Sequence, residues 1–575
     1  MANLITLVAL LVLPFAVGDY WTYQLGLYYL YAMVAVGLGL CWGQAGFLPL
    51  GQAMFFGVSA YLSAILLKAM PGSYLIYLLL PLAALVSGVL ALLIGLMVFR
   101  RDGGSGPFFS LITLALSMLA FQIASNWNSV TGGFNGLAGI PALPGIDDFR
   151  ANYYLATVAL VAVLAIASWL YSAPLGVLWR AIAQNERRVA LFGFNPHHYK
   201  AIAFAVSGFF AGLAGALYAP QQGLVSPQVV GFAFSAELLV WTAVGGRGRL
   251  YGPVLGTLLV GSMTAEMRDG IPYWEVIMAG FFMVVVLAFP KGVIGLVTPV
   301  TERLRRAFAG AHPQVAIEAP AQTRAGVQEA LTIDAARVRA GGITILNDLT
   351  VAFPPKGIAC IIGPNGAGKT STFNLISGEL PASAGSVKVG ALDITNLTPY
   401  RVARLGFGRK LQAPSVFPEL SIGDNLAIAL WSSSARPLDL LRRSLRRWSS
   451  PIIGELADRY AFLGKEDAPA SDLSHGERQI LELAMALAVQ PRILLLDEPC
   501  AGLSADETSR AVDIIRWAAE RLGNAIIIIE HDMALVRRIA DRVMVFNNGA
   551  LLAEGSVADI QANPSVQAVY VGGQK

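Results

Sequence analysis

The first 300 of the 575 residues are almost continuously apolar, and this constrains the fold more than any other feature. No Lys or Arg occurs before Lys68, and charged residues stay sparse up to about Pro299. With 55% hydrophobic and only 14% charged residues, the chain is too apolar for a soluble protein of this length. Beyond residue 300 the composition becomes that of an ordinary soluble domain. The sequence therefore predicts a membrane domain at 1–300, a linker at 301–330 and a soluble domain at 331–575.

The membrane domain is expected to be all-α, because a spanning helix needs about 20 mainly apolar residues. Ten segments approach that requirement, near 2–17, 22–41, 46–67, 74–99, 107–125, 152–171, 201–219, 235–246, 250–265 and 275–297. Several are short, and the third is interrupted by glycines and a proline between Gly43 and Gly57. Broken helices are tolerated in a membrane only where protein or water covers the freed backbone, and in transporters they mark the pathway.

Basic residues predict the orientation, because cytoplasmic loops carry an excess of Lys and Arg. If the spans alternate, four basic clusters fall on one side: Arg100, Arg101, Arg180, Arg187, Arg188, Lys200, Arg247, Arg249, Lys291, Arg303, Arg305 and Arg306. We expect that side to be the cytoplasm, with both termini and the soluble domain there. Residues 126–152 and 220–235 then face outward, and Lys68 is also placed outside. These clusters account for the net charge of +4, so the expected surroundings are membrane lipid and no nucleic acid.

Two polar features interrupt the membrane domain. The loop Ala173–Lys200 has a helical pattern, which predicts a short helix docking onto the soluble domain, with a solvated loop as the alternative. Glu237 lies in an apolar stretch, where a carboxylate is costly and usually functional. A position near the outer interface is the alternative for that residue.

The soluble domain contains a nucleotide-binding pattern, G-x-x-x-x-G-K-[ST], at Gly363–Thr370. Such a loop surrounds a triphosphate with backbone N–H groups and a helix N-terminus, while its lysine neutralises the outer phosphates and its hydroxyl holds Mg²⁺. The residues expected to bind ATP are Gly363, Pro364, Asn365, Gly366, Gly368, Lys369, Thr370 and Ser371. A strand is predicted at Ile358–Ile362 before the loop and a helix at Ser371–Ser377 after it.

Further strands end in polar residues, which predicts a mostly parallel α/β sheet with its ligands at the carboxyl ends. Ile493–Leu496 leads to Asp497 and Glu498, and Ala525–Ile529 is followed closely by His531. Gln412 follows a third predicted strand, Gly406–Leu411. We expect a P-loop NTPase domain with a helical subdomain at about 412–479.

The chemistry of phosphoryl transfer assigns roles to these residues, because it asks a protein mainly to position water and offset charge. Thr370, Gln412 and Asp497 are the candidate Mg²⁺ ligands. Glu498 is the candidate to polarise the attacking water, and His531 would bond the γ-phosphate. Gln412 would also report nucleotide occupancy toward the docking surface.

At this point the chain resembles an ABC transporter, and more narrowly the importers of branched-chain amino acids, urea and short amides. In the soluble domain the resembling segments are 363–378, FPEL at 417–420, LSHGERQ at 473–479 and 529–543. In the membrane domain they are 43–61, TGGFNGL at 131–137, 195–204, AGLAGALYA at 211–219 and VGGRGRLYGPVLG at 244–256. The resemblance covers nearly the whole chain except the linker, so it implies a permease and an ATPase fused in one chain.

The resemblance also implies partners and a location. Two ATPase domains would close head to tail, so that Ser474 and Gly476 of one complete the ATP site built on Lys369 of the other. The second permease and ATPase half is expected to consist of different subunits rather than a second copy. A periplasmic solute-binding protein would dock on the outward loops, and the location would be the bacterial inner membrane. The pairs Val240-Trp241 and Tyr199-Lys200 lean toward urea-type permeases, yet the general pattern is shared with branched-chain amino acid systems.

The chain departs from the family pattern at three places. Ala340 stands where an aromatic residue normally stacks on adenine, and the signature reads SHGE rather than SGGQ. After Pro499 the usual aspartate is absent, and Asp506 is the candidate substitute. Two other functions remain as alternatives: an ABC exporter, which would favour about six long helices, and an ATP-gated channel, which would pass solute downhill without turnover.

Overall fold

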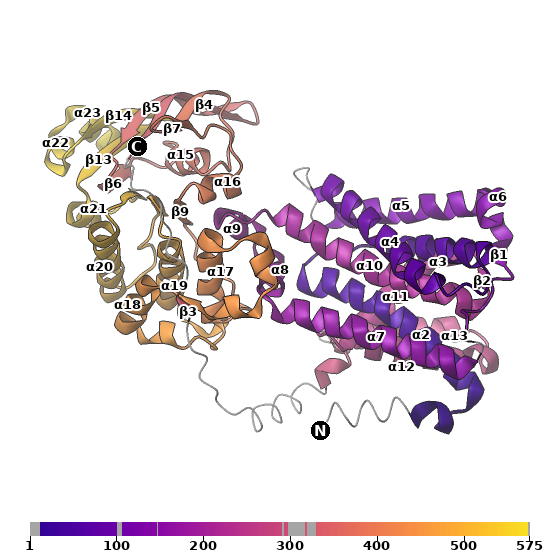
Figure 1. Cartoon of the computed structure of the whole chain (residues 1–575). Helices are drawn as coiled ribbons and strands as arrows, with labels where there is room; N and C mark the ends of the chain where they lie inside the picture. Colours follow the sequence, from indigo (N-terminus) through magenta and orange to yellow (C-terminus); the bar gives the residue numbers. More distant parts are fainter. Residues whose placement is uncertain are drawn as a thin grey trace. The chain divides into compact units, whose positions relative to one another are not determined.

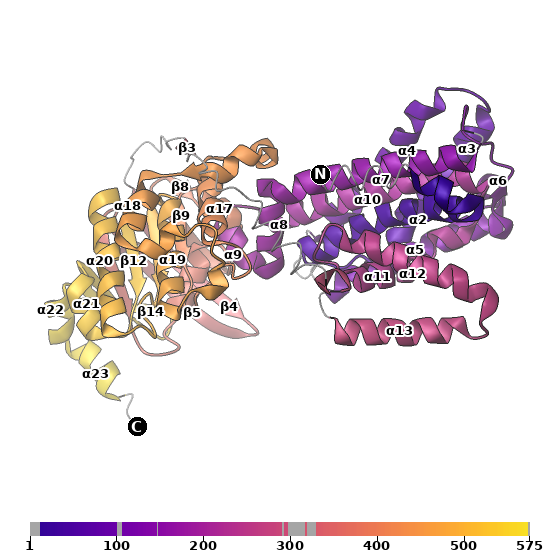
Figure 2. The ribbon, with the colours of Figure 1, turned by 90° about the horizontal axis from the view of Figure 1, so that it is seen from below.

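The computed structural model describes residues 12–99, 106–146, 148–289, 292–296, 317–318 and 329–572, and these form two compact units (Figures 1 and 2). The first unit comprises the described residues of Met1–Ala183 and Pro196–Pro313. The second comprises those of Gln184–Asn195 and Gln314–Lys575. A short stretch from within the predicted membrane domain, 184–195, therefore folds with the second unit.

The first unit is built from apolar helices. Six of its described helices are long and apolar enough to cross a membrane. They are α2 (Gly18–Gly39, continued to Gln44 by the π-helical turn η1, Leu40–Gln44), α3 (Gln52–Ala69), α4 (Ile76–Phe99), α5 (Pro107–Asn126), α7 (Phe149–Ser172) and α10 (Pro196–Gln222). Three further helices are α11 (Phe232–Gly245), α12 (Gly252–Gly270) and α13 (Trp274–Ala288).

The prediction of about ten spans is only partly supported. Most of the first predicted span, 2–17, lies outside the described residues, and each of the other nine overlaps one of these helices. Since only six of them satisfy the length and hydropathy of a full crossing, the count of ten is not confirmed. Among the residues used for orientation, Arg100, Arg101, Lys291, Arg303, Arg305 and Arg306 lie outside the described ranges.

The third predicted span, 46–67, was wrong at its start. Residues 45–51 are not helical, and α3 begins only at Gln52. The Leu50 N–H donates to the hydroxyl of Thr113 on α5 at 3.0 Å, and the Ser110 hydroxyl donates to the Leu48 carbonyl at 2.6 Å. Neighbouring side chains thus satisfy the backbone of the break, as an apolar environment requires.

Helix α10 is the central helix of the first unit and packs against α2, α3 and α4. Small residues make this packing close: a Cβ at Gly215 would overlap the carbonyl oxygen of Phe56 on α3. The motif AGLAGALYA therefore serves a tight helix contact at this point.

The two loops predicted to face outward lie together in the first unit. Strand β1 (Leu137–Ala138) from one loop pairs antiparallel with β2 (Leu224–Val225) from the other. The Lys68 ammonium, at the end of α3, donates to the Ala138 carbonyl at 2.8 Å. The pairing agrees with the prediction that these loops and Lys68 share one side.

The second unit contains two sheets. A six-stranded sheet has the order β14-β13-β6-β12-β11-β9, in which only β14 is antiparallel to its neighbour. Its strands are β6 (Gly357–Ile362), β9 (Phe407–Lys410), β11 (Ile493–Asp497), β12 (Ala525–Ile529), β13 (Arg542–Asn547) and β14 (Ala550–Gly555). An antiparallel sheet, in the order β5-β4-β7-β8, comprises β4 (Leu331–Ala340), β5 (Ile343–Phe353), β7 (Ala384–Val389) and β8 (Leu392–Asp393). The predicted parallel α/β core is confirmed.

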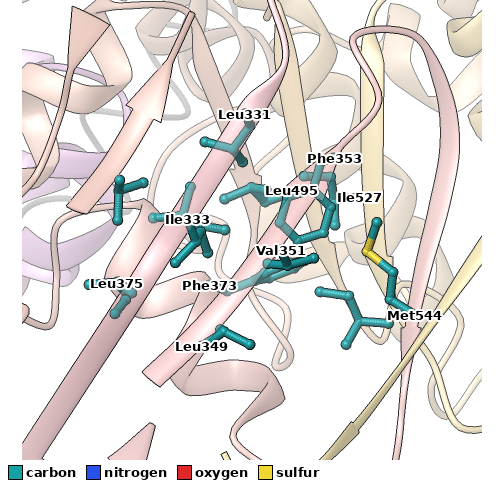
Figure 3. Close-up of a cluster of buried hydrophobic side chains, with 14 of the residues drawn as sticks. Leu331, Ile333, Leu349, Val351, Phe353, Phe373, Leu375, Leu495, Ile527 and Met544 are labelled. Atoms are coloured by element: carbon teal, nitrogen blue, oxygen red, sulfur yellow. The ribbon is translucent and has the colours of Figure 1, made fainter. Parts of the chain in front are cut away.

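The core of the second unit lies between these sheets around α15 (Lys369–Ile376), the helix that follows the nucleotide-binding loop (Figure 3). Phe373 of α15 is fully buried among side chains such as Val351 of β5 and Leu495 of β11. Because the helix is anchored in this way, the loop that connects β6 to α15 is held in a fixed position at the carboxyl end of β6.

A helical segment separates β9 from β11 and includes α17 (Ile422–Ser434), α18 (Pro451–Arg459) and α19 (His475–Ala488). Two other helices, α16 (Pro399–Arg404) and α20 (Ala505–Leu522), belong to the same unit. Most of the predicted linker lies outside the described residues. Its residues Ile317–Glu318 form a short strand, β3, which pairs in parallel with β10 (Trp448–Ser449). No strand in the linker was predicted from its sequence.

Candidate nucleotide-binding site

The nucleotide-binding loop has the backbone that its sequence requires. Gly363 has φ of 150°, and a Cβ there would overlap the carbonyl oxygen of Phe546 on β13. Gly368 caps α15 with φ of 93°, in the left-handed region that favours glycine. Lys369 curls over the loop and donates to the carbonyls of Gly363 at 2.7 Å and Pro364 at 3.0 Å. The loop, the lysine and the start of α15 thus have the arrangement expected of a turn that binds an anion.

Asp497 and Thr370 lie beside that turn. The Thr370 hydroxyl donates to the Asp497 carboxylate at the end of β11. Burial raises the pKa of the Asp497 carboxyl, and the positive charge of Arg409 opposes this shift. Burial lowers the pKa of the Lys369 ammonium, against the pull of Glu498 and Asp497. Lysine and carboxylates therefore share one electrostatic environment, as phosphate and metal binding require.

The predicted Mg²⁺ ligands fit a hard cation, which prefers oxygen donors. Asp497 is 2% exposed, and its Oδ1 has no hydrogen-bond partner among the described residues, so a buried acceptor is available. No group of three or more His, Cys, Asp or Glu side chains gathers in the described ranges.

Glu498 stands between two predicted partners. Its Oε2 accepts a hydrogen bond from Gln412 Nε2 at 3.0 Å, and its Oε1 lies 3.9 Å from His531 Nδ1. The Glu498 backbone has φ of 44°, unusual for a residue with a side chain, and its N–H donates to the Ile529 carbonyl. Strained backbone of this kind persists where the surrounding structure holds a functional side chain in place. The structure thus brings Gln412, Glu498 and His531 together.

The signature residues begin helix α19. Ser474 caps it by accepting from the Glu477 N–H, while Glu477 accepts in return from the Ser474 N–H. A Cβ at Gly476 would overlap the Glu507 carboxylate in the first turn of α20. Ser504, after the missing aspartate, caps α20 through the same reciprocal pattern with Glu507.

The segment 184–195 contains the short helix α9 (Glu186–Leu191) and packs within the second unit (Figure 1). Asn185 Nδ2 donates to Ser415 Oγ at 2.9 Å, and Gln184 Oε1 accepts from the Glu419 N–H at 3.0 Å. Arg404 Nε donates to the Gly193 carbonyl at 2.7 Å. The predicted docking of the loop Ala173–Lys200 is confirmed for residues 184–195, where the alternative of a solvated loop is wrong. The preceding helix, α8 (Pro174–Gln184), belongs to the first unit up to Ala183.

Sequence reasoning did not predict that five charged residues of this region interact. Arg409 of β9 bonds Asn374 Oδ1 at the end of α15 and also pairs with Glu379, which Arg187 of α9 contacts from the other side. Glu482 of α19 is 0% exposed and pairs with Arg188 of α9. One signal was available: a lone glutamate inside the apolar helix sequence ILELAMALA must have a partner when buried.

Two sites mentioned earlier have a definite place. Ala340 ends β4 at the hairpin turn Gly341–Gly342, whose φ angles are 57° and 83°. In the first unit, Glu237 has an exposed side chain on α11. Trp241 and Phe234 of the same helix pack on Tyr31 of α2, with ring centroids 5.6 and 5.0 Å from it.

Comparisons with known proteins match both halves of the chain. The family described as "Branched-chain amino acid transport system / permease component" matches residues 21–287, and the family described as "ABC transporter" matches 346–501. The High-affinity branched-chain amino acid transport ATP-binding protein LivG of Escherichia coli (strain K12) is 34% identical over 251 residues, 43% of this chain and 98% of that protein. The corresponding protein BraF of Pseudomonas aeruginosa is 32% identical over 257 residues, 42% of this chain and 97% of its own. A crystal structure of the ADP conformation of an ATP-binding cassette is 27% identical, with 42% of this chain and 99% of that chain covered and a TM-score of 0.37.

Proposed function

Because this chain belongs to the ABC transporter family, as a branched-chain amino acid permease component joined to an ATP-hydrolysing component, we propose that it drives import of a small amino-acid-class solute. The proposed location is the bacterial inner membrane, with the second unit, called the ATPase unit from here on, in the cytoplasm. Branched-chain amino acids are the first solute class, and urea and short amides are the second.

One observation carries the proposal. Segment 184–195 lies within the residues matched by the permease family, yet it folds as part of the ATPase unit. A permease loop seated in this way gives the ATPase a direct mechanical contact with the permease sequence.

The site residues supply the steps of hydrolysis. When bound, Mg²⁺ would offset the phosphate charge. Lys369 and the loop amides hold the phosphates, and Thr370, Gln412 and Asp497 would hold the ion. Glu498 accepts the hydrogen bond of the attacking water, and Gln412 holds Glu498 in position for that contact. His531 donates a hydrogen bond to the γ-phosphate. These roles need Glu498 within reach of both Gln412 and His531, which the distances of 3.0 and 3.9 Å support.

The active assembly has two ATPase domains, and Ser474 and Gly476 of one face the nucleotide held by Lys369 of the other. The second half consists of different subunits. A solute-binding protein docks on the outward face, where β1 and β2 pair. At the turn Gly341–Gly342 the chain lacks the usual aromatic, so adenine is held by other contacts than stacking on residue 340.

The test is uptake into vesicles. The chain, its partner subunits and its binding protein are reconstituted with ATP and Mg²⁺ trapped inside, and labelled leucine, valine, urea and acetamide are supplied outside in separate experiments. We expect ATP-dependent accumulation of one class above the external concentration, abolished by Lys369→Ala.

Each other outcome rejects the import proposal. ATP-driven loss of preloaded solute through the same assembly would identify an exporter. Solute that only equilibrates, at the same rate with a non-hydrolysable ATP analogue, would identify a gated channel.

A further inference from the structure

The buried carboxylate of Glu482 joins three elements of the ATPase unit. Its Oε1 lies 3.3 Å from Nη1 of Arg188 on α9 and accepts a hydrogen bond from the Leu411 N–H at 3.2 Å. Its Oε2 lies 3.9 Å from Nζ of Lys410 at the end of β9. The side chains of Arg188 and Glu482 are 0% exposed, and that of Lys410 is 1% exposed. The docked helix and the strand before Gln412 therefore meet on one side chain.

Burial makes this junction sensitive to small displacements. A buried ion pair is favourable only while its geometry is good, because each ion has lost its water. Arg188 has the further constraint of donating to the Arg409 carbonyl at 2.5 Å, and its guanidinium lies 4.6 Å from the centre of the Phe192 ring. Burial lowers the pKa of Arg188, and Glu482 opposes that shift. A movement of Arg188 therefore either breaks its ion pair with Glu482 or displaces Glu482 as well.

Direct contacts continue from Glu482 to the reacting centre. Leu411, whose N–H is held by Glu482, immediately precedes Gln412, and Gln412 Nε2 donates to Glu498 at 3.0 Å. A displacement of Glu482 therefore shifts the base of the Gln412 segment. Glu482 also lies on α19, the helix that begins at the signature residues. The same displacement therefore also reaches Ser474 and Gly476, which are proposed to face the nucleotide held by the other ATPase domain.

We propose that Glu482 is a positioning residue that transmits the movement of Arg188 on α9 to Gln412, so that a solute-loaded permease sets the rate of ATP hydrolysis. The proposal rests on the import function proposed above. It assigns the transmission to one buried carboxylate rather than to the general contact of α9 with the ATPase unit.

A neighbouring residue on the same helix provides a matched control. Arg187 pairs with Glu379, but its side chain is 55% exposed, and Glu379 keeps Arg409 as a second partner. Removing the Arg187 charge therefore leaves no buried ion unpaired and does not touch Gln412. Arg187→Met tests loss of a charged contact on α9 without loss of the Glu482 junction.

The experiment measures ATP hydrolysis and uptake in the reconstituted full assembly, with and without solute-loaded binding protein. The variants are Glu482→Gln, Arg188→Met, both together, Arg188→Lys and the control Arg187→Met. We expect Glu482→Gln and Arg188→Met each to reduce the solute-induced stimulation of hydrolysis by about fivefold or more, within the usual range of coupling between sites. The double variant should be no worse than either single one, Arg188→Lys should recover part of the stimulation, and Arg187→Met should keep it.

A purely structural role would give a different result. Hydrolysis and uptake would then fall together with the amount of folded protein, and the stimulation ratio would stay at the wild-type value, which overturns the proposal. If Arg188→Met does not fold, Glu482→Gln, which keeps the side-chain volume and an acceptor for the Leu411 N–H, decides the question alone. Uptake that is absent already in the wild type would refute the import function instead, so the two failures are distinguishable.

Discussion

Replacing Glu498 by glutamine tests the central assignment of the ATPase site. The side chain keeps its length, and its amide oxygen can still accept the hydrogen bond that Gln412 Nε2 donates at 3.0 Å. The strained backbone, with φ of 44°, is unchanged because only the side-chain terminus differs. What is lost is the negative charge that accepts a proton from the attacking water.

The size of the effect follows from that single loss. A positioned acid or base contributes about 10²–10⁴-fold to a rate, so hydrolysis should fall by about that factor. At about 1.36 kcal/mol for each tenfold change, the barrier rises by roughly 3–5 kcal/mol. Affinity for ATP should be equal or higher, because the variant removes a negative charge whose field reaches Lys369 in the phosphate site.

The assay combines phosphate release by the reconstituted assembly with nucleotide binding measured on the same preparation. Glu419→Gln is a suitable control, because Glu419 contacts Gln184 through its backbone N–H rather than its carboxylate. Turnover of Glu498→Gln within a few-fold of wild type, at unchanged nucleotide affinity, would refute the role of Glu498. Loss of nucleotide binding would show instead that Glu498 supports the loop.

Three further predictions concern packing and the membrane unit. Gly246→Leu should abolish uptake, because Gly246 has φ of 110°, a backbone conformation that residues with a side chain rarely adopt; Gly248→Ala, with open space around its Cβ, is the control that should transport normally. Phe373→Ala should lower the stability of the ATPase unit by about 3–5 kcal/mol, because it empties a fully buried position; a thermal transition within a degree of wild type would contradict this. Glu237→Gln should slow uptake without slowing basal hydrolysis, because a carboxylate in an apolar membrane helix is costly and usually functional; uptake at the wild-type rate would assign it to the outer interface.

The residues of the nucleotide site were predictable because their arrangement is local. The loop Gly363–Thr370 lies between one strand and one helix, so glycine spacing alone determines its backbone. Asp497 and Glu498 follow a buried strand directly, and parallel strands end at a common edge. Each predicted strand corresponds to β6, β9, β11 or β12, because the pattern that predicts a strand lies within a few adjacent residues.

Only the tertiary structure decided how the permease sequence meets the ATPase. Arg188 and Arg409 are 221 positions apart, and nothing in the spacing of either residue identifies the other. The pairing of Glu482 on α19 with Arg188 on α9 depends on how these helices are placed by the packing of the whole unit. The break at 45–51 has the same origin, since a glycine-rich apolar stretch stays helical or opens according to which side chains reach its backbone. Chemistry carried by adjacent residues can be predicted from the sequence, whereas contacts between distant segments are determined only when the chain has folded.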